Sequence, residues 1–353
     1  KRQPRHDEEL RTLPKAVLHD HLDGGLRVET VIELADAVGH ELPSHEVSGL
    51  AQWFHQGRSG SLERYLEAFI HTLAVMQTPE AIRRVAHETG LDLAADGVVY
   101  AEERFDPGLL IGRGLSREDV VEAALDGFDG ARRETGISLH LIVCGLRSHD
   151  DTALAARAAV RFRDEGVVGY DLAGPEAGFP PDDHMEAISL IHRADLGLTL
   201  HAGEGDGPHS VWRALALCGA QRIGHGVHLV DATDFDGQRI TEMDRLPRFV
   251  VDRQVPLEIC ITSNLHTATY ASAALHPFGA MREAGFNVSL STDNRLMSNV
   301  SMTSEYATAR DAFGLGTDDL GKITVAAIMA GFGPWTERRR LVEEIVRPAY
   351  GLS

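Results

Sequence analysis

The feature that most constrains the fold is a regular alternation of short apolar runs with longer helical stretches. Continuously apolar runs suit strands that are covered on both faces, as in a parallel sheet. Between them, apolar residues recur at helical spacing. We expect eight strands, at residues 16–21, 98–105, 138–144, 167–172, 196–201, 222–227, 256–262 and 286–291.

Eight strands separated by helices predict an α/β fold of the (β/α)8 barrel type. The competing doubly wound open sheet needs a glycine-rich phosphate-binding turn after an early strand, and His21-Leu-Asp-Gly-Gly25 is not one. A chain of 353 residues could hold two ordinary domains or one barrel. We expect a single domain over residues 1–353.

The longest excursion between strands lies between the first and the second. Its helical patterns at residues 30–38, 62–76 and 79–96 predict a helical insertion over about 28–96. We expect this insertion to cap the carboxyl-terminal mouth of the barrel. Residues 1–14 are expected to form an arm. Three helical segments after residue 303 are expected to close the outside of the barrel.

Charge and composition exclude several classes of partner. A formal net charge of −19 would repel nucleic acids and anionic membrane surfaces. No run approaches the roughly 18 apolar residues of a membrane span, and the first residues lack the apolar core of a signal peptide. The three cysteines lie far apart in apolar runs, which favours free thiols in a reducing, cytoplasmic setting. This charge is compatible with a monomer or a dimer.

Metal-competent side chains stand at the ends of three predicted strands. His19 and His21 are two residues apart on one strand, so both point into the barrel. This pair alone is as compatible with two core histidines as with a zinc site. His201 adds a third imidazole and Asp293 a carboxylate, both directly after apolar runs. Together these four residues form a donor set that suits zinc.

Two further residues could handle protons or water beside such a metal. Glu204 follows His201 by three residues, so its carboxylate can exchange protons near the cation. His225 stands between Gly224 and Gly226, which permit close approach to its backbone. His225 could be a fourth imidazole ligand, or it could orient a water molecule on the metal.

Six motifs along the chain, taken together, resemble those of the adenosine deaminases of the amidohydrolase superfamily. The motifs are His19-Asp-His21-Leu-Asp-Gly24, Asp171-Leu-Ala-Gly174, His201-Ala-Gly-Glu204, Arg222-Ile-Gly-His225-Gly226, Thr262-Ser-Asn264 and Ser291-Thr-Asp293. They occur in order over nearly the whole chain, one for each strand at which the family carries one. The resemblance implies a (β/α)8 barrel with one zinc ion held by His19, His21, His201 and Asp293.

The resemblance also implies the roles of the other residues. Glu204 would carry a proton to purine N1 and His225 would align the attacking hydroxide, with Asp293 a third member of the catalytic group. The backbone of Gly174 would meet purine N3, and Asp23 the ribose 5′-hydroxyl. The chemistry agrees, since replacing an amine by oxygen needs hydroxide near neutral pH and zinc lowers the pKa of bound water to about 7.

Three features separate this chain from related patterns. The predicted strand 167–172 has no lysine, whereas binuclear members of the superfamily bridge two metals there with a carbamylated lysine; we therefore expect one metal. The pattern H-x-E with P-C-x-x-C of cytidine-type deaminases is absent. Relatives often carry Asp where this chain has Pro175. They often carry Asp-Pro where this chain has Asn294-Arg295. Asn294 falls where purine N7 is expected, which leaves the exact substrate open.

The leading hypothesis is hydrolytic deamination of adenosine and 2′-deoxyadenosine to inosine and 2′-deoxyinosine, with release of ammonia. The nearest alternative is a deaminase of free adenine or of a modified 6-aminopurine nucleoside. A non-catalytic deaminase-like binding protein is a second alternative, against which Glu204 and the complete set of ligands argue. A hydrolase of cyclic amides is a third, and the missing lysine argues against it.

Overall fold

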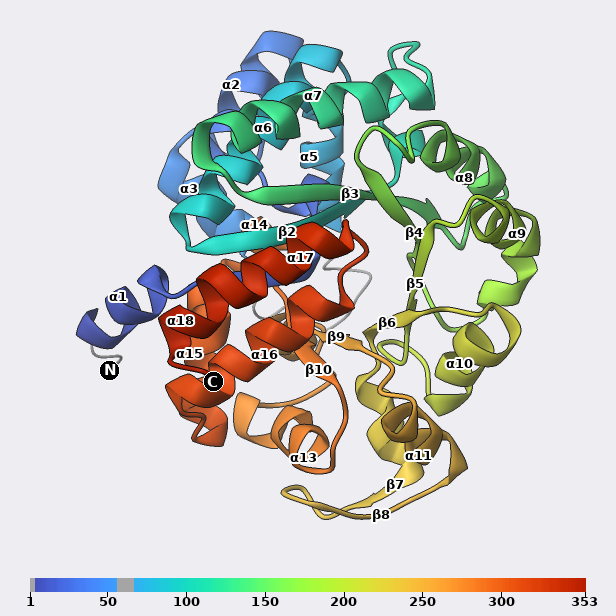
Figure 1. Ribbon diagram of the computed structural model, residues 1–353. Coiled ribbons are helices and arrows are strands. Elements are labelled where there is room, and N and C mark those ends of the chain that lie inside the picture. The colour runs from blue at the N-terminus through green and yellow to red at the C-terminus, as the bar shows by residue number, and fades with distance from the viewer. Residues whose placement is uncertain (1–3, 56–66) are drawn as a thin grey trace.

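The computed structural model describes residues 4–55 and 67–353, and its centre is a barrel of eight parallel strands. Backbone hydrogen bonds between Asp293 and both His19 and His21 join the turn after the last strand to the first strand, and they nearly close the barrel drawn in Figure 1. The predicted (β/α)8 barrel is confirmed. In spatial order the strands are β1 (Lys15–His21), β2 (Val98–Phe105), β3 (Ser138–Leu146), β4 (Val167–Ala173), β5 (Gly197–Ala202), β6 (Arg222–His225), β9 (Leu257–Ile259) and β10 (Val288–Leu290).

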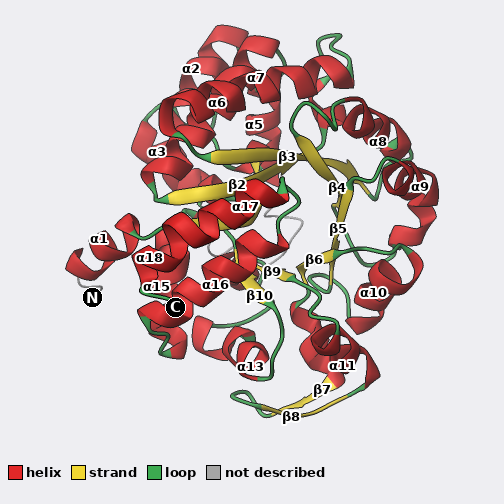
Figure 2. Cartoon of the chain, in the orientation of Figure 1, coloured by secondary structure: helices red, strands yellow, loops and turns green. Residues whose placement is uncertain are grey.

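Helices surround the strands, as Figure 2 shows. The longest, α7 (Arg117–Thr135), begins at a capping box of Ser116 and Asp119 and ends at Gly136 in the left-handed conformation. Such local signals explain why its bounds were predictable from sequence. The helices between the later strands are α8 (Thr152–Arg161), α9 (Met185–Arg193), α10 (Pro208–Trp212), α11 (Arg245–Asp252), α12 (Ile261–His266) and α13 (Phe278–Glu283).

The excursion after β1 contains α2 (Val28–Val38), α3 (Val47–Phe54), α5 (Phe69–Val75) and α6 (Pro79–Ala95). Of the expected helix 62–76, residues 62–66 lie outside the described residues. α3 was not predicted. α6 packs closely on α7, since a Cβ on Gly127 would lie 2.4 Å from the Arg83 carbonyl oxygen. α6 therefore belongs to the outer ring, whereas α5 lines the pocket described below. That residues 28–96 form one capping unit stays a prediction.

The C-terminal helices do more than cover the outside. α15 (Met302–Phe313) and α16 (Thr317–Ala330) pack beside β1 and β10, as expected. Phe332, between α16 and α17 (Trp335–Leu341), closes the amino-terminal end of the barrel: its ring lies 3.7 Å from the Arg222 guanidinium. A Cβ on Gly197 would collide with that ring at 2.3 Å. α17 continues through one π-helical turn into α18 (Arg347–Tyr350).

Three segments differ from the prediction. Part of the expected arm is helical as α1 (Pro4–Thr12). The hairpin β7 (Thr233–Phe235) and β8 (Ile240–Met243) lies outside the barrel and was not predicted. The expected strand 256–262 is only Leu257–Ile259, because the Glu305 carboxylate accepts bonds from the Thr262 amide and hydroxyl and the chain enters α12. Across the described residues, no helix combines the length and apolarity that crossing a membrane requires.

Candidate active site

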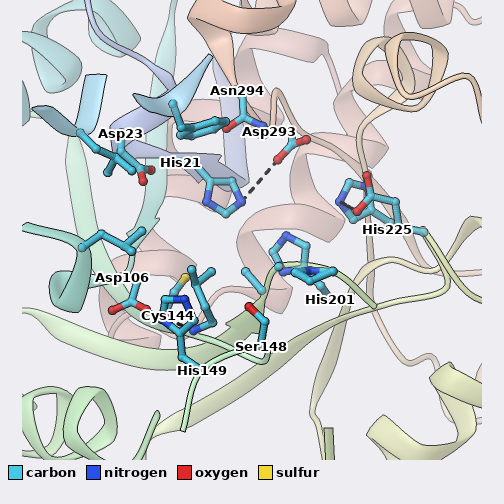
Figure 3. A pocket seen from close by; sticks show the side chains of 18 residues that line it. His21, Asp23, Asp106, Cys144, Ser148, His149, His201, His225, Asp293 and Asn294 are labelled. Atoms are coloured by element: carbon cyan, nitrogen blue, oxygen red, sulfur yellow. Dashed lines mark hydrogen bonds and ion pairs between the residues drawn. The ribbon is translucent and has the colours of Figure 1, made fainter. Parts of the chain in front are cut away.

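A pocket of about 320 Å³ opens where the carboxyl ends of the strands meet (Figure 3). In a barrel of this kind the active site lies at this face. His19 lies beneath it, in contact with the rings of His21 and His201. The expected residues that line the pocket are His21, Asp23, Gly174, His201, Glu204, His225, Asp293 and Asn294.

The four expected metal ligands come together at one point. His19, His21, His201 and Asp293 each offer one ligand atom, and these atoms lie within 4.8 Å of one another. Asp293 Oδ1 is 3.4 Å from Nε2 of both His19 and His21. Three imidazoles and a carboxylate from strands β1 and β5 and the turn after β10 thus form a group that could hold a metal ion.

Two of the expected site residues have a strained backbone. Asp293 and His225 have φ of 61° and 62°, in the left-handed region that non-glycine residues seldom adopt. Two hydrogen bonds hold Asp293 in this conformation. Its backbone N–H donates to the His19 carbonyl oxygen, and the Ser263 hydroxyl donates to its Oδ2 at 2.6 Å. These contacts fix the backbone conformation of Asp293, as expected where a side chain must be held in one direction.

A second layer fixes the imidazoles. Nδ1 of His19 lies 3.1 Å from Glu258 Oε2, and Nδ1 of His201 lies 2.8 Å from Asp171 Oδ2. Each pair uses Nδ1 and so leaves Nε2 for a ligand, and His19 Nε2 is buried with no hydrogen-bond partner among the described residues. Carboxylates that take the second ring nitrogen are a regular feature of metal-bound histidines. The donor set and its supports therefore fit zinc.

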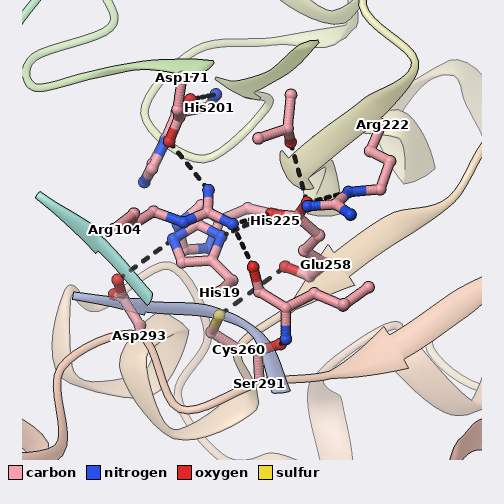
Figure 4. A network of polar contacts seen from close by, with 12 residues as sticks. His19, Arg104, Asp171, His201, Arg222, His225, Glu258, Cys260, Ser291 and Asp293 are labelled. Atoms are coloured by element: carbon pink, nitrogen blue, oxygen red, sulfur yellow. Dashed lines mark hydrogen bonds and ion pairs between the residues drawn. The ribbon is translucent and has the colours of Figure 1, made fainter. Parts of the chain in front are cut away.

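Buried charges connect these carboxylates through the barrel interior (Figure 4). Arg104 binds Asp171 at 2.9 Å and Glu258 at 2.8 Å, and Arg222 binds Glu258 at 2.7 Å and Glu102 at 2.6 Å. Although burial raises the pKa of Glu258, the charges of Arg104 and Arg222 hold it well below its usual range. Sequence reasoning missed this network; charged residues inside apolar runs were its only signal.

Glu204 and His225 face each other across the pocket floor, with 3.4 Å between Oε2 and Nε2. Burial, and then the charge of Asp293, raise the pKa of Glu204 to about 8. Burial lowers the pKa of His225 well below its usual range. The pair is therefore a carboxyl group able to hold a proton near neutrality beside a neutral imidazole.

Glu176 was not expected and supports the loop that carries Glu204. Its carboxylate accepts hydrogen bonds from three successive amides, those of Gly203 at 2.5 Å, Glu204 at 3.0 Å and Gly205 at 2.8 Å. Gly203 has φ +71°, and a Cβ there would lie 2.8 Å from Val211. No local pattern reveals Glu176, because its partners lie 27–29 residues further along the chain.

The remaining pocket walls hold the expected substrate contacts. Asp23 and Asn294 are each 5% exposed, and Oδ1 of each is buried without a partner among the described residues. Burial raises the pKa of Asp23 to about 7. Gly174 has φ +90°, a conformation that favours glycine. Arg295 turns away from the pocket, since its Nε donates to Asp20 Oδ2 at 2.7 Å.

A (β/α)8 barrel defines an aminohydrolase of the amidohydrolase type when the carboxyl ends of its strands gather three imidazoles, a carboxylate and a glutamate able to hold a proton near neutral pH. The sequence model of the adenosine deaminase family matches residues 14–348. This chain belongs to the adenosine deaminase family.

Its relatives share nearly the whole chain. It is 47% identical over 348 residues to the adenosine deaminase of Mycobacterium tuberculosis, covering 97% of this chain and 95% of the relative. It is 45% identical over 356 residues to that of Mycobacterium leprae, covering 99% and 98%.

Solved structures share the fold. An adenine deaminase from Arthrobacter aurescens superposes with a TM-score of 0.85 at 24% identity, covering 95% of this chain and 98% of that one, a likeness of fold alone. The apo N6-methyl-AMP deaminase from Arabidopsis thaliana gives 0.80 at 26%, covering 98% of each.

Proposed function

We propose that this chain hydrolyses adenosine and 2′-deoxyadenosine to inosine and 2′-deoxyinosine plus ammonia, as a single domain with one zinc ion. The observation that carries the proposal is the convergence of His19, His21, His201 and Asp293 within 4.8 Å, directly beside Glu204 and His225. These four residues would hold the zinc, which fits their donor atoms and their supporting carboxylates. When bound, zinc supplies the Lewis acidity that makes water nucleophilic near neutral pH.

The residues of the chain supply the proton handling and the orientation. Glu204 takes a proton from the attacking water and delivers it to purine N1, which must be protonated as the ring accepts the nucleophile. The raised pKa of Glu204 suits this role, since the group can hold a proton near neutral pH. His225 orients the nucleophile. The amine leaves as ammonia when it gains the remaining proton of the hydroxyl group that has added to the ring carbon, and that oxygen becomes the carbonyl of the product.

The pocket walls would recognise the nucleoside. Gly174 offers its backbone to N3, Asn294 faces N7, and Asp23 meets the ribose 5′-hydroxyl. The pocket volume of about 320 Å³ is within the usual range for a small-molecule ligand. Relatives named adenosine deaminase at 45–47% identity support adenosine as the substrate. Two solved structures of similar fold are complexes of ADAL, one with GMP and one with IMP, which supports a purine ligand of this class.

A panel of aminopurines tests the proposal, with loss of the 6-amino group followed by ultraviolet absorbance. Adenosine and 2′-deoxyadenosine should have the highest kcat/KM, and 5′-deoxyadenosine should be poorer because it lacks the partner of Asp23. Free adenine as the best substrate would assign the chain to the base deaminases. If a 5′-phosphorylated or N6-modified compound has the highest kcat/KM, the chain is a deaminase of modified 6-aminopurine nucleosides. No turnover of any member by the zinc-loaded protein would overturn the activity altogether.

A further inference from the structure

A chain of hydrogen bonds leads from the backbone to His225 through two residues that no step above uses. The Phe278 amide donates to Nδ1 of His276 at 3.1 Å, and Nε2 of His276 lies 3.1 Å from Oδ1 of Asn264. Nδ2 of Asn264 lies 3.3 Å from Nδ1 of His225. Asn264, His276 and His225 are 0%, 3% and 1% exposed, so water does not compete for these bonds.

The direction of this chain is fixed at its first member. A backbone N–H can only donate, so Nδ1 of His276 must present its lone pair. Burial lowers the pKa of His276 to about 3, so the ring is neutral and carries its one proton on Nε2. That N–H requires an acceptor, which is the amide oxygen of Asn264.

The same reasoning passes from Asn264 to His225. With its oxygen facing His276, Asn264 turns its NH2 group toward Nδ1 of His225, which must then be the acceptor. A ring nitrogen that accepts a hydrogen bond carries no proton, so the His225 ring is not doubly protonated. A neutral imidazole that accepts at Nδ1 carries its proton on Nε2. Every donor in the chain is thus matched with one acceptor, and reversing any one bond would break the others.

Nε2 of His225 points into the active site. It lies 3.4 Å from Glu204 Oε2, and the His225 ring packs 4.8 Å from the His19 ring and 5.3 Å from the His201 ring. Nε2 has no hydrogen-bond partner within the described part of the chain. Its N–H is therefore available to a substrate or to an oxygen nucleophile.

We propose that Asn264 and His276 are positioning residues that hold His225 in the tautomer protonated at Nε2, which makes His225 a hydrogen-bond donor to the nucleophile and not its base. The role of His225 toward the nucleophile rests on the proposed function, whereas the tautomer of His225 does not depend on it. Two results follow. Glu204, and not His225, carries the proton transferred from the attacking water. His225 is not a metal ligand, because its Nε2 carries hydrogen.

The first test reads the tautomer in the zinc-loaded wild-type protein, without substrate. In protein labelled with 15N-histidine, long-range 1H–15N spectra distinguish a protonated from an unprotonated ring nitrogen, and His225→Asn and His276→Asn assign the two residues by the loss of their signals. Both residues should show protonated Nε2 and unprotonated Nδ1 at neutral pH. A His225 ring that is protonated at Nδ1, doubly protonated or metal-bound at Nε2 would overturn the proposal. This measurement needs no active enzyme, so a failure of the proposed reaction leaves it intact.

The second test breaks the chain in the middle. Asn264→Asp offers only acceptor oxygens to Nδ1 of His225, so the ring should move its proton to Nδ1. The lost donor should lower kcat by about 10²–10³-fold, with KM changed by less than about 3-fold. The matched control is Asn287→Asp, whose amide bonds the Gln254 carbonyl on the exposed, amino-terminal side of β10. It should leave both the tautomer and kcat unchanged. A kcat that falls while His225 keeps its Nε2 proton would mean that Asn264 has only a structural role.

His276→Phe removes the first directing group while it keeps an aromatic ring. Asn264 is then free to turn over, so both tautomers of His225 should be populated and kcat should fall by less than in Asn264→Asp. Unchanged spectra and kcat in this variant would overturn the role of His276.

Discussion

At the scale of single residues, Glu204 is the side chain on which we expect turnover to depend most. Its Oε2 is 3.4 Å from Nε2 of His225, and Glu204 is not one of the four predicted metal ligands. Glu204→Gln keeps the shape but cannot carry a proton. The variant should retain zinc and ground-state binding while kcat falls by at least about 10²–10⁴-fold. Metal analysis, inhibitor binding and turnover check the three parts, and a kcat within a few-fold of wild type would remove Glu204 from the mechanism.

Asn294 is the residue at which the proposed substrate contacts depart from the usual family pattern. Purine N7 is an acceptor, so its partner must donate, and an Asn amide donates at every pH whereas a carboxyl group must first be protonated. Losing this bond in a dry pocket should cost about 1–3 kcal/mol, or roughly 5- to 150-fold in kcat/KM. Wild-type protein should therefore prefer adenosine to 7-deazaadenosine, and Asn294→Ala should narrow the gap. Equal rates for the two substrates on the wild type would show that Asn294 does not contact N7.

At the scale of elements, the loop after β4 positions the loop after β5. Glu176 accepts three amides of that second loop, and only Pro175 separates it from Gly174 on the pocket wall. Glu176→Gln places an NH2 group against at least one of these N–H donors. The loop should then shift and displace Glu204. This displacement should lower kcat by about 10- to 100-fold, as small misplacements of catalytic groups do.

A control for general loss of stability is Asp96→Asn, in which a carboxylate that accepts the Thr303 amide is changed at the amino-terminal side of β2. It should leave kcat unchanged. Equal kcat values for Glu176→Gln and wild type would show that the loop keeps its shape without Glu176.

The junction between β9 and α12 should make stability depend on pH. Burial raises the pKa of Glu305 to about 7 from 4.5. Because the folded pKa is above the unfolded value, this group contributes stability that is complete below about pH 4.5 and is lost as the pH rises through 7. Glu305→Gln removes this dependence. Relative to wild type, its free energy of unfolding should rise between pH 5 and pH 8, by up to about 3 kcal/mol.

Urea unfolding of both proteins at the two pH values measures this change. Glu344→Gln, on the exposed side of the last helical segment, is the control and should track the wild type. A Glu305→Gln profile parallel to that of the wild type would contradict the expected shift.

Apolar runs and the residues that end them predicted the eight strands and brought His19, His201 and Asp293 to the right end of the barrel. Those signals are local. What could not be predicted depends on partners distant in sequence: β9 ends early because Glu305 binds Thr262, and Phe332 closes the barrel against Arg222. The same holds within the site, where the contacts of Glu176, Asn264 and His276 exist only after the strands have closed.

At the scale of the whole molecule, a bound metal should stabilise the barrel, because its ligands come from β1, β5 and the turn after β10. A ligand that binds only the folded state at 100 times its Kd adds about 2.7 kcal/mol. For a chain of this size each kcal/mol corresponds to roughly 1–2 °C in Tm. A strong chelator should therefore lower Tm by several degrees and abolish activity. One equivalent of zinc should restore both; two equivalents, or activity without metal, would contradict the mononuclear site.

The charge network inside the barrel also limits how this protein can evolve. Arg104, Arg222 and Glu258 each bridge two buried partners, so replacing any one leaves an uncompensated charge that costs several kcal/mol. Single substitutions at these positions therefore give variants that fold poorly, although a matched set of apolar replacements could be stable. In a random mutagenesis library the helix surfaces should accumulate substitutions freely. The barrel interior should change only in linked groups, and a directed-evolution campaign that explores it needs several codons randomised at once.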